Sequence, residues 1–182
     1  MLNPADVSLS KFLARILRHS PESVGLTLDS EGWGELDRIL AAASQRKLAH
    51  GPHDIERVVA TNNKKRFELS ADGTRIRAVQ GHSTGLVDRQ FEAVAPPEKL
   101  FHGTATLSLP DILRDGLRPG RRHHVHLSID PATAILVGRR HGSPVVLAIA
   151  AAQMAGDGYR FHLAENGVWL TKCVPPKYLH PL

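Results

Sequence analysis

The fold is decided by residues 66–79, which read Arg66-Phe67-Glu68-Leu69-Ser70-Ala71-Asp72-Gly73-Thr74-Arg75-Ile76-Arg77-Ala78-Val79. Two runs of alternating polar and apolar residues flank the dipeptide Asp-Gly, which is a strong signal of a β-hairpin. Toward the N-terminus, apolar residues recur at helical spacing in residues 9–17, 36–43 and 55–59. Three helices followed by a hairpin predict a winged-helix lobe, an arrangement that often binds nucleic acid and sometimes only protein.

Polar and proline residues mark the limits of these helices. We expect Asp6 to cap the N-terminus of the first helix, because an Asp side chain can accept hydrogen bonds from the first backbone amides. The first helix must end near Pro21, and the third follows the break at Gly51-Pro52.

A proline-rich stretch divides the chain into two predicted lobes. Val94-Ala95-Pro96-Pro97-Glu98 cannot continue a helix and favours a short extended linker, so the lobes are residues 1–94 and 98–182. In the second lobe we expect helices at 108–116 and 130–140, the latter capped by Asp130. Strands are expected at 100–102, 124–127, 144–150, 159–163 and 168–171. The chain is therefore predicted to be of the α+β class.

The composition is that of an ordinary globular protein of 182 residues, 42% of them hydrophobic. The single cysteine, Cys173, excludes an internal disulfide and a thiolate zinc cluster. The longest apolar run, residues 145–152, has the length of a buried strand rather than that of a membrane helix. No N-terminal apolar run precedes a cleavage site, so we expect a cytoplasmic protein that is neither secreted nor inserted into a membrane.

Arginine dominates the basic residues, with 16 Arg against 7 Lys and a formal net charge of +5. Residues 1–95 carry a net charge of +1, whereas residues 96–182 carry +4. Because the planar guanidinium group matches phosphate oxygens two at a time, this bias suggests phosphates held in defined geometry. The second half is the expected location of an anionic ligand.

Several polar clusters could carry chemistry, and each also has a purely structural explanation. Arg18-His19 and Arg139-Arg140-His141-Gly142 end predicted helices, where the helix dipole favours cations. Lys64-Lys65-Arg66 is of the kind usually found on a solvated surface. Gln80-Gly81-His82-Ser83 and His102-Gly103-Thr104 contain a glycine that could serve either an ordinary turn or the close approach of a ligand to the backbone.

The densest cluster is Arg121-Arg122-His123-His124-Val125-His126-Leu127-Ser128. Strand alternation puts His124 and His126 on one face, and imidazole is a common zinc ligand. No Asp, Glu or Cys lies nearby in the sequence to complete a metal site, so hydrogen bonding to a polar ligand is favoured. The Rossmann fingerprint, the P-loop sequence and the His-Glu-x-x-His motif do not occur in the sequence.

These clusters occur together, in an order that resembles one family. The matching segments are Leu9-Ser10-Lys11-Phe12-Leu13, Leu17-Arg18-His19, Pro21, Gly32, Lys65-Arg66-Phe67, Ile76-Arg77-Ala78, Gln80-Gly81-His82-Ser83, His102-Gly103-Thr104, His124-Val125-His126-Leu127-Ser128 and Gly138-Arg139-Arg140-His141-Gly142. Over nearly its whole length the chain resembles the RNA 2'-phosphotransferase (KptA) family, NAD-dependent enzymes that remove the 2'-phosphate left at a splice junction. The resemblance implies a winged-helix RNA-binding lobe and an ADP-ribosyltransferase-like NAD-binding lobe, with RNA and NAD meeting in the cleft between them.

The chemistry implied by the resemblance has two steps, consumes NAD as a co-substrate and needs no metal. The RNA 2'-phosphate attacks the anomeric carbon of the nicotinamide ribose and expels nicotinamide. The ribose 2''-hydroxyl then attacks the phosphate, which frees the RNA 2'-hydroxyl and leaves ADP-ribose 1'',2''-cyclic phosphate. The implied partner is a tRNA-like 2'-phosphorylated RNA, and a monomer is expected.

The same resemblance assigns roles to individual residues. The family's Arg-His-Arg-Arg tetrad corresponds to Arg18, His19, Arg66 and Arg140, although Arg139 is adjacent to the last of these. The three arginines would clamp the phosphate, and His19 would transfer a proton in the second step. NAD contacts are implied for His102, Gly103, Thr104, Arg122, His124, His126, Ser128 and Asn166. RNA-phosphate contacts are implied for Gln80, His82 and Ser83.

Two other functions are compatible with the sequence. A protein of the same fold could ADP-ribosylate a terminal phosphate of RNA or DNA and stop after the first step, so that no cyclic phosphate forms. Alternatively, the chain could be a non-enzymatic winged-helix module that binds nucleic acid and carries a degenerate partner lobe. NAD binding and nicotinamide release distinguish the enzymatic functions from the non-enzymatic one.

Overall fold

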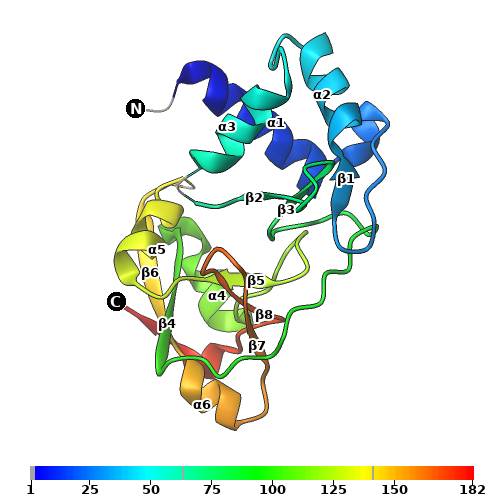
Figure 1. Ribbon diagram of the computed structural model, residues 1–182. Coiled ribbons are helices and arrows are strands. Elements are labelled where there is room, and N and C mark those ends of the chain that lie inside the picture. Colours follow the sequence, from blue (N-terminus) through cyan, green and yellow to red (C-terminus); the bar gives the residue numbers. More distant parts are fainter. Residues whose placement is uncertain (1–2, 63, 141) are drawn as a thin grey trace. The chain divides into compact units, whose positions relative to one another are not determined.

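The protein is described by a computed structural model that covers residues 3–62, 64–140 and 142–182 (Figure 1). Within these residues the chain is mixed α and β, with six α-helices and three small antiparallel sheets. It divides into two compact units, Met1–Gln90 and Phe91–Leu182. None of the described helices is both long enough and apolar enough to span a membrane.

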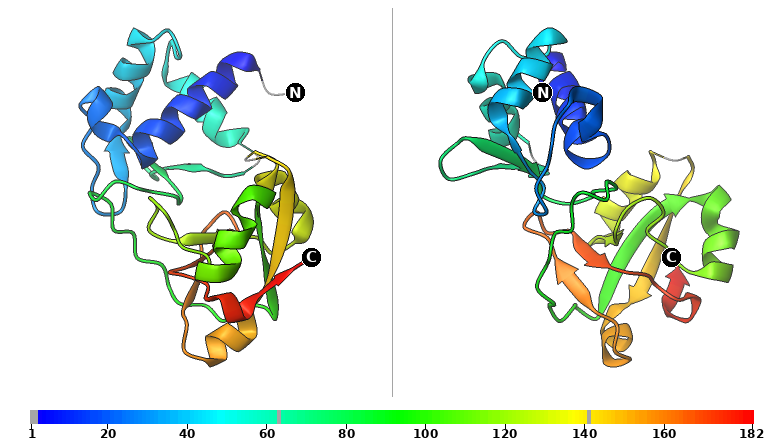
Figure 2. Two further views of the ribbon diagram at one scale, coloured as in Figure 1. Left: turned by 180° about the vertical axis from the view of Figure 1, so that it is seen from behind. Right: turned by 90° about the vertical axis from the view of Figure 1, so that its right-hand side faces the viewer.

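The described part of the first unit contains three α-helices, one 3-10 helix and three short strands. In chain order these are α1 (Pro4–Arg18), η1 (Pro21–Val24), β1 (Trp33–Glu35), α2 (Leu36–Gln45), α3 (Pro52–Ala60), β2 (Phe67–Leu69) and β3 (Arg75–Ala78). The strands form a sheet in the order β1-β3-β2. The three helices gather on one side of this sheet (Figure 2). The predicted helices are therefore confirmed.

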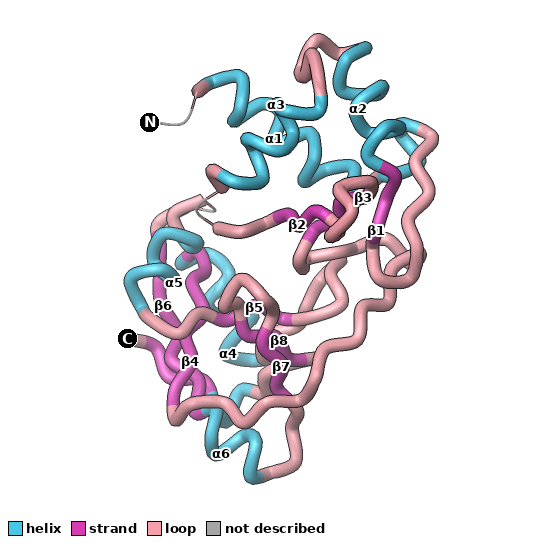
Figure 3. Tube along the Cα trace, viewed as in Figure 1, coloured by secondary structure: helices cyan, strands magenta, loops and turns pink. Residues whose placement is uncertain are grey.

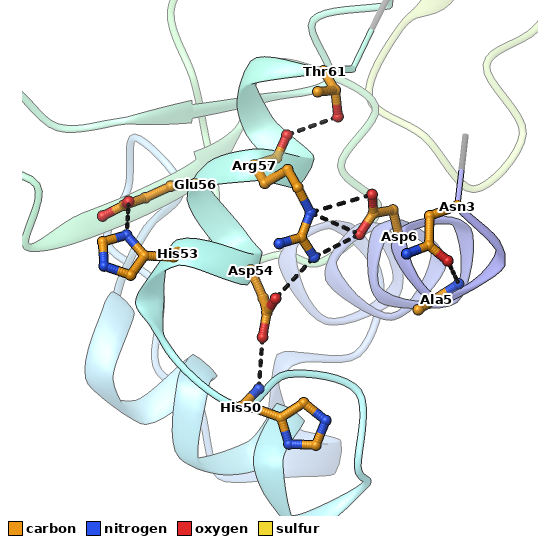
Figure 4. Close-up of polar contacts among 9 residues, drawn as sticks. All are labelled: Asn3, Ala5, Asp6, His50, His53, Asp54, Glu56, Arg57 and Thr61. Atoms are coloured by element: carbon orange, nitrogen blue, oxygen red, sulfur yellow. Dashed lines mark hydrogen bonds and ion pairs between the residues drawn. The ribbon is translucent and has the colours of Figure 1, made fainter. Parts of the chain in front are cut away.

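Helix α1 begins three residues earlier than the position that the Asp6 cap predicts. Asn3 is the N-cap, and its side chain accepts a hydrogen bond from Ala5 N at 3.1 Å. Pro4 starts the helix because its fixed φ suits the first turn and its missing N–H is not needed there. Asp6 instead accepts hydrogen bonds from Arg57 of α3, with Nη2 and Oδ1 2.9 Å apart (Figure 4). The expectation that Asp6 caps the helix is therefore wrong, and this carboxylate links α1 to α3.

The predicted hairpin is confirmed, and a third strand extends it. Leu69 pairs with Ile76 across the turn, and the Asp72 Oδ1 atom accepts a hydrogen bond from Thr74 N at 3.1 Å. Strand β1 pairs on the other side of β3. The sequence did not reveal β1 because its central residue is Gly34, and glycine is depleted in strands.

The core of the first unit collects the apolar stripe predicted for each helix. Leu13 and Ile16 of α1, Ile39 of α2 and Ile55 of α3 are fully buried, and Ile76 of β3 joins them. Burying a side chain of this size contributes about 1.5–3 kcal/mol relative to leaving it exposed. The helical spacing of these residues therefore positions the ends of α1 and β3, which carry polar clusters.

The second unit is built from two antiparallel sheets and short helices (Figure 3). In chain order its elements are β4 (Lys99–Ala105), η2 (Thr106–Ser108), α4 (Leu109–Asp115), β5 (Val125–Leu127), α5 (Pro131–Gly138), β6 (Pro144–Ala150), α6 (Ala151–Gly156), β7 (Phe161–Leu163), β8 (Trp169–Thr171), η3 (Pro176–Tyr178) and β9 (Leu179–Pro181). One sheet has the order β4-β6-β9 and the other β5-β8-β7. Leu100, Leu147 and Phe161 lie in the core of this unit.

The five strands predicted for this part of the chain are confirmed, but the bounds agree fully only for β6. Strands β5 and β8 begin one residue later than predicted, and β7 begins at Phe161 instead of 159. Strand β4 continues to Ala105 instead of ending at His102, because its residues pair with β6 as far as Ala105 and Pro144. The cap of α5 is also confirmed, since Asp130 Oδ1 accepts a hydrogen bond from Thr133 N at 2.7 Å. Helix α6 and strand β9 were not predicted.

Hydrogen bonds place residues 91–94 in the second unit. Val94 N donates to the carbonyl of Phe161 at 2.9 Å, and Ala93 forms a β-bridge with His162. The imidazole Nδ1 of His162 lies 3.1 Å from the carbonyl oxygen of Glu92. The second unit therefore starts at Phe91, before the consecutive prolines.

Candidate functional site

In the first unit, the C-terminal end of α1 meets the loop that follows β3. Ser83 N donates to the carbonyl of Arg18 at 2.8 Å, and His19 Nδ1 lies 2.9 Å from Ser83 Oγ. Gly81 lies against the guanidinium of Arg18, since a Cβ at Gly81 would be 3.7 Å from the Arg18 Cζ. Two polar clusters that are distant in the sequence, Arg18-His19 and Gln80–Ser83, therefore form one surface.

Local packing fixes the loop that carries Gln80, His82 and Ser83. His82 is buried and packs against Gly32, where a Cβ would lie 3.0 Å from His82 Nε2. Gly32 has a φ of 82°, which is a conformation that residues with a side chain rarely adopt. Gly32 is therefore required both by its backbone and by the imidazole that occupies the space beside it.

Arg66 lies beside the start of the same loop. It immediately precedes β2, and Val79 N donates to its carbonyl at 2.9 Å. The Arg66 Nη1 atom donates to Asn62 Oδ1 at 3.1 Å, and the guanidinium of Arg89 donates to the carbonyl of Val79. The first unit therefore gathers Arg18, His19 and the 80–83 loop into one surface, with the backbone of Arg66 at its edge and the Arg66 side chain held by Asn62.

In the second unit, β4 and β5 bring together the two histidine-containing motifs. His102 Nδ1 lies 3.1 Å from the carbonyl oxygen of His126, and Phe101 and Ser128 exchange two backbone hydrogen bonds of 2.8 Å. Val125 and Leu127 are buried, while His124 and His126 are partly exposed. The alternation of residues predicted for this strand is therefore confirmed.

Gly103 and Thr104 lie within β4, where they are buried. A Cβ at Gly103 would be only 1.7 Å from the carbonyl oxygen of Ala134, so α5 occupies the space that a side chain would need. The sequence left open whether this glycine serves a strand-exit turn or the approach of a ligand. In the structure, the segment that lies close to Gly103 is helix α5.

Two arginines of this unit are electrostatically coupled. Arg122 Nη1 lies 3.4 Å from His126 Nδ1. Burial, and then the positive charge of the nearby Arg140, lower the pKa of the Arg122 guanidinium. Two neighbouring cations repel each other, and a bound anion removes that repulsion. The arrangement of Arg122, Arg140 and His126 is therefore suited to an anionic group such as a phosphate.

Two further candidate residues occupy other parts of this unit. The ring centroid of His124 lies 6.1 Å from that of Phe91 and 6.0 Å from that of His162, both in edge-to-face geometry. Asn166 lies in the turn between β7 and β8, and its Oδ1 accepts a hydrogen bond from Val168 N at 3.4 Å. His141 lies outside the described residues.

Among the described residues, no group of three or more His, Cys, Asp or Glu side chains has a geometry that could hold a metal ion. The sequence missed two residues that support the polar clusters, Asn62 and Arg89. Both are buried. Asn62 donates to Ser10 Oγ of α1, and Arg89 donates to the carbonyl of Val79, which are contacts between separate parts of the chain. The only sequence signal for Asn62 is its position just before the basic run that contains Arg66.

Comparison with known proteins identifies the family. Residues 4–173 match the model described as "RNA 2'-phosphotransferase, Tpt1 / KptA family". A protein of Agrobacterium fabrum named "Probable RNA 2'-phosphotransferase" is 56% identical over 174 residues, which is 96% of this chain and 93% of the relative. Proteins of the same name from Pseudomonas aeruginosa and Burkholderia lata are 54% and 51% identical. Their matches cover 93% and 97% of this chain, and 93% and 91% of the relatives.

These similarities, together with the polar clusters of both units, define an enzyme of the transferase class. The chain belongs to the RNA 2'-phosphotransferase, Tpt1 / KptA family. The resemblance recognised from the sequence motifs is thereby confirmed.

Proposed function

We propose that the protein removes an internal 2'-phosphate from RNA and transfers it to the ADP-ribose part of NAD. One observation carries this proposal: the contact of Arg18 and His19 with the 80–83 loop, in a chain that belongs to this family. Fixed guanidinium groups beside an imidazole suit a phosphate that must be bound and then transferred. The contact unites residues that the sequence motifs assign to catalysis with residues assigned to RNA-phosphate binding.

The proposed fold follows from the order of the elements. In the first unit the order α1-β1-α2-α3-β2-β3 supports a winged-helix lobe that binds RNA. In the second unit, two antiparallel sheets and the paired histidine motifs support an ADP-ribosyltransferase-like lobe that binds NAD. The NAD contacts proposed there are His102, Gly103, Thr104, Arg122, His124, His126, Ser128 and Asn166.

The coupled pair Arg122 and Arg140 fits an anionic dinucleotide or a phosphate. We assign Arg122 to the NAD pyrophosphate and Arg140 to the RNA phosphate. As a substrate, NAD supplies an anomeric carbon from which nicotinamide departs. A phosphate oxygen of the RNA forms the new bond to that carbon, and the bond to the nicotinamide nitrogen breaks.

In the second step, the ribose 2''-oxygen bonds to phosphorus and its proton passes to water, while the bond from phosphorus to the RNA 2'-oxygen breaks. Arg18, Arg66 and Arg140 bind the phosphate oxygens and stabilise their charge in the transition state. His19 donates the proton that the departing RNA oxygen needs. Because Ser83 Oγ contacts Nδ1 of His19, we assign this proton transfer to Nε2. Gln80, His82 and Ser83 contact the RNA phosphate.

The proposed function is tested by mixing the protein with NAD and a short oligonucleotide that carries an internal 2'-phosphate. Mass spectrometry should detect nicotinamide, 2'-hydroxyl RNA and ADP-ribose 1'',2''-cyclic phosphate. An ADP-ribosylated RNA that accumulates without cyclic phosphate would instead indicate a reaction that stops after the first step. Recovery of unchanged NAD and RNA would contradict the proposal.

A further inference from the structure

A hollow of about 370 Å³ opens between α1 and α3 in the first unit. Its apolar lining includes Val7 and Ala14 of α1 and Val58 of α3. Its charged lining includes Lys11, Lys64 and Arg66. We call it the α1–α3 hollow. Binding sites for small molecules and for parts of larger ligands typically combine an apolar wall with a few converging polar groups at this scale, about 300–1,000 Å³.

A buried amide organises the polar side of the α1–α3 hollow. Asn62 is only 7% exposed, and its Oδ1 accepts hydrogen bonds from Arg66 Nη1 at 3.1 Å and Lys64 N at 3.2 Å. Its Nδ2 atom donates to Ser10 Oγ at 3.4 Å. The wall that carries Arg66 is therefore fixed to α1 before any ligand binds, which lowers the entropic cost of binding.

The charge of the α1–α3 hollow favours an anion. Asp6 is the acidic residue in its described lining, and its carboxylate is bonded to Arg57 (Figure 4). Arg57 also binds Asp54 at 2.8 Å, and hydrogen bonds to both carboxylates raise the pKa of its guanidinium. Arg57 of α3 therefore neutralises the negative charge of Asp6. Lys11, Lys64 and Arg66 contribute positive charge to the same lining.

We propose that the α1–α3 hollow is a subsite for one RNA nucleotide that adjoins the 2'-phosphorylated nucleotide. A nucleotide combines a flat, largely apolar base with a phosphate, which matches an apolar wall beside cations. Arg66 lines the hollow and is also assigned to the phosphate that reacts, so the two subsites share one residue. This inference rests on the proposed function, because it requires RNA as the substrate.

The subsite is tested with Ala14→Leu, which fills the hollow without removing a polar group. Ala5→Leu is the matched control, because Ala5 is exposed on the same helix and outside the lining. The substrates are a 2'-phosphorylated mononucleotide and two 2'-phosphorylated dinucleotides, with the additional nucleotide on the 5' or the 3' side. We expect Ala14→Leu to raise the ratio of KM for one dinucleotide to KM for the mononucleotide by about tenfold. Ala5→Leu should leave this ratio at its wild-type value.

The dinucleotide that responds identifies the side on which the neighbouring nucleotide binds. An unchanged KM ratio for both dinucleotides, in an Ala14→Leu protein with a wild-type melting temperature, overturns the subsite and leaves the proposed function intact. If the wild-type protein converts none of the three substrates, the proposed function fails and the subsite fails with it.

If Ala14→Leu does not fold, Lys11→Ala tests the same subsite, with Arg15→Ala as the control on α1. Lys11 lines the hollow, whereas Arg15 is exposed and outside the lining. Lys11→Ala should raise KM for the responding dinucleotide and weaken the dependence of that KM on salt, because one contact to a phosphate is lost. An equal effect of Arg15→Ala, or no effect of Lys11→Ala, overturns the subsite.

Discussion

Arg139 and Arg140 are adjacent in the sequence, but their surroundings differ. Arg139 is the C-cap of α5, and its backbone N–H donates to the carbonyl of Ile135 at 3.0 Å. Arg140 lies close enough to Arg122 for its charge to lower the pKa of that guanidinium. A cation that already faces a like charge gains additional stabilisation when an anion binds between the two. For this reason the proposed function assigns the phosphate to Arg140 and not to Arg139.

This difference between neighbours predicts different kinetic effects. Arg140→Ala should lower kcat/KM for 2'-phosphorylated RNA by about 10²-fold or more, because a charge that stabilises the transition state is lost. Arg139→Ala, as the matched control, should stay within about threefold of wild type, as expected for an exposed arginine at a helix end. Steady-state kinetics of both variants measure the effect. The opposite order of effects would assign the role to Arg139.

At the scale of elements, the β2–β3 hairpin depends on the carboxylate in its turn. Asp72 Oδ1 accepts hydrogen bonds from Ser70 Oγ at 2.5 Å and from Thr74 N at 3.1 Å. The hydroxyl of Ser70, followed by the amide of Thr74, lowers the pKa of Asp72 to about 2. The ionised carboxylate is therefore the form that holds the turn.

The turn should make stability depend on pH at the acid end. Because the pKa is lowered on folding, Asp72 stabilises the fold above its ordinary pKa of about 3.9 and ceases to do so as the pH falls toward 2. Asp72→Ala should therefore melt at a lower temperature than wild type at neutral pH. The difference should narrow between about pH 4 and pH 2. Thermal unfolding followed by circular dichroism measures both proteins, and a difference that is constant over this range would contradict the assignment.

Helix α5 packs so closely on β4 that one position tolerates no side chain. A Cβ at Gly103 would meet the carbonyl oxygen of Ala134 at 1.7 Å, so Gly103→Ala must displace α5. Such overpacking costs about 1–3 kcal/mol, which lowers Tm by about 4 °C or more in a domain of this size. Gly156→Ala is the control in the same unit, because its Cβ would meet nothing within 4 Å. An unchanged Tm for Gly103→Ala would contradict the packing described for α5.

At the scale of the whole molecule, the net charge of +5 is built largely from arginine. Phosphate contacts release counterions, so RNA binding should weaken as salt rises. Raising the salt concentration from about 50 to about 200 mM should lower kcat/KM for 2'-phosphorylated RNA by about tenfold or more. A variant such as Arg160→Ala, outside the proposed sites, should keep the wild-type salt dependence. If salt lowered kcat/KM for NAD as much as kcat/KM for the RNA, the effect would not depend on RNA. That result would contradict a charge-based interaction with RNA.

Local signals predicted the parts of the fold that local chemistry determines. The Asp72-Gly73 turn and the Asp130 cap were recognisable because short-range hydrogen bonds create them. Strands β1 and β9 were not, because they contain Gly34 and Pro181, residue types that strands disfavour, and each strand is defined by pairing with a distant strand. Pro4 shifted the start of α1 away from Asp6, whose carboxylate is used by Arg57 instead.

In the candidate site, too, local sequence patterns identified some features, and others depend on contacts between distant parts of the chain. Motifs identified Arg18-His19 and the 80–83 loop separately, but only the fold places His19 against Ser83. Asn62 could not be found from the sequence, because a single Asn has no pattern and its role arises from the burial and the partners that the fold supplies. Sequence therefore identified the chemical groups, while their contacts required the tertiary structure.

The two backbone hydrogen bonds between Phe101 and Ser128 allow local opening of the second unit to be followed by amide hydrogen exchange. Each amide donates to the carbonyl of the other residue at 2.8 Å, so separating the two strands at this point exposes both amides together. In deuterated solvent the two amide protons should then exchange at matched rates set by one opening event. Phe101 precedes His102 directly, so this pair of amides would report each detachment of the two histidine-bearing segments from one another.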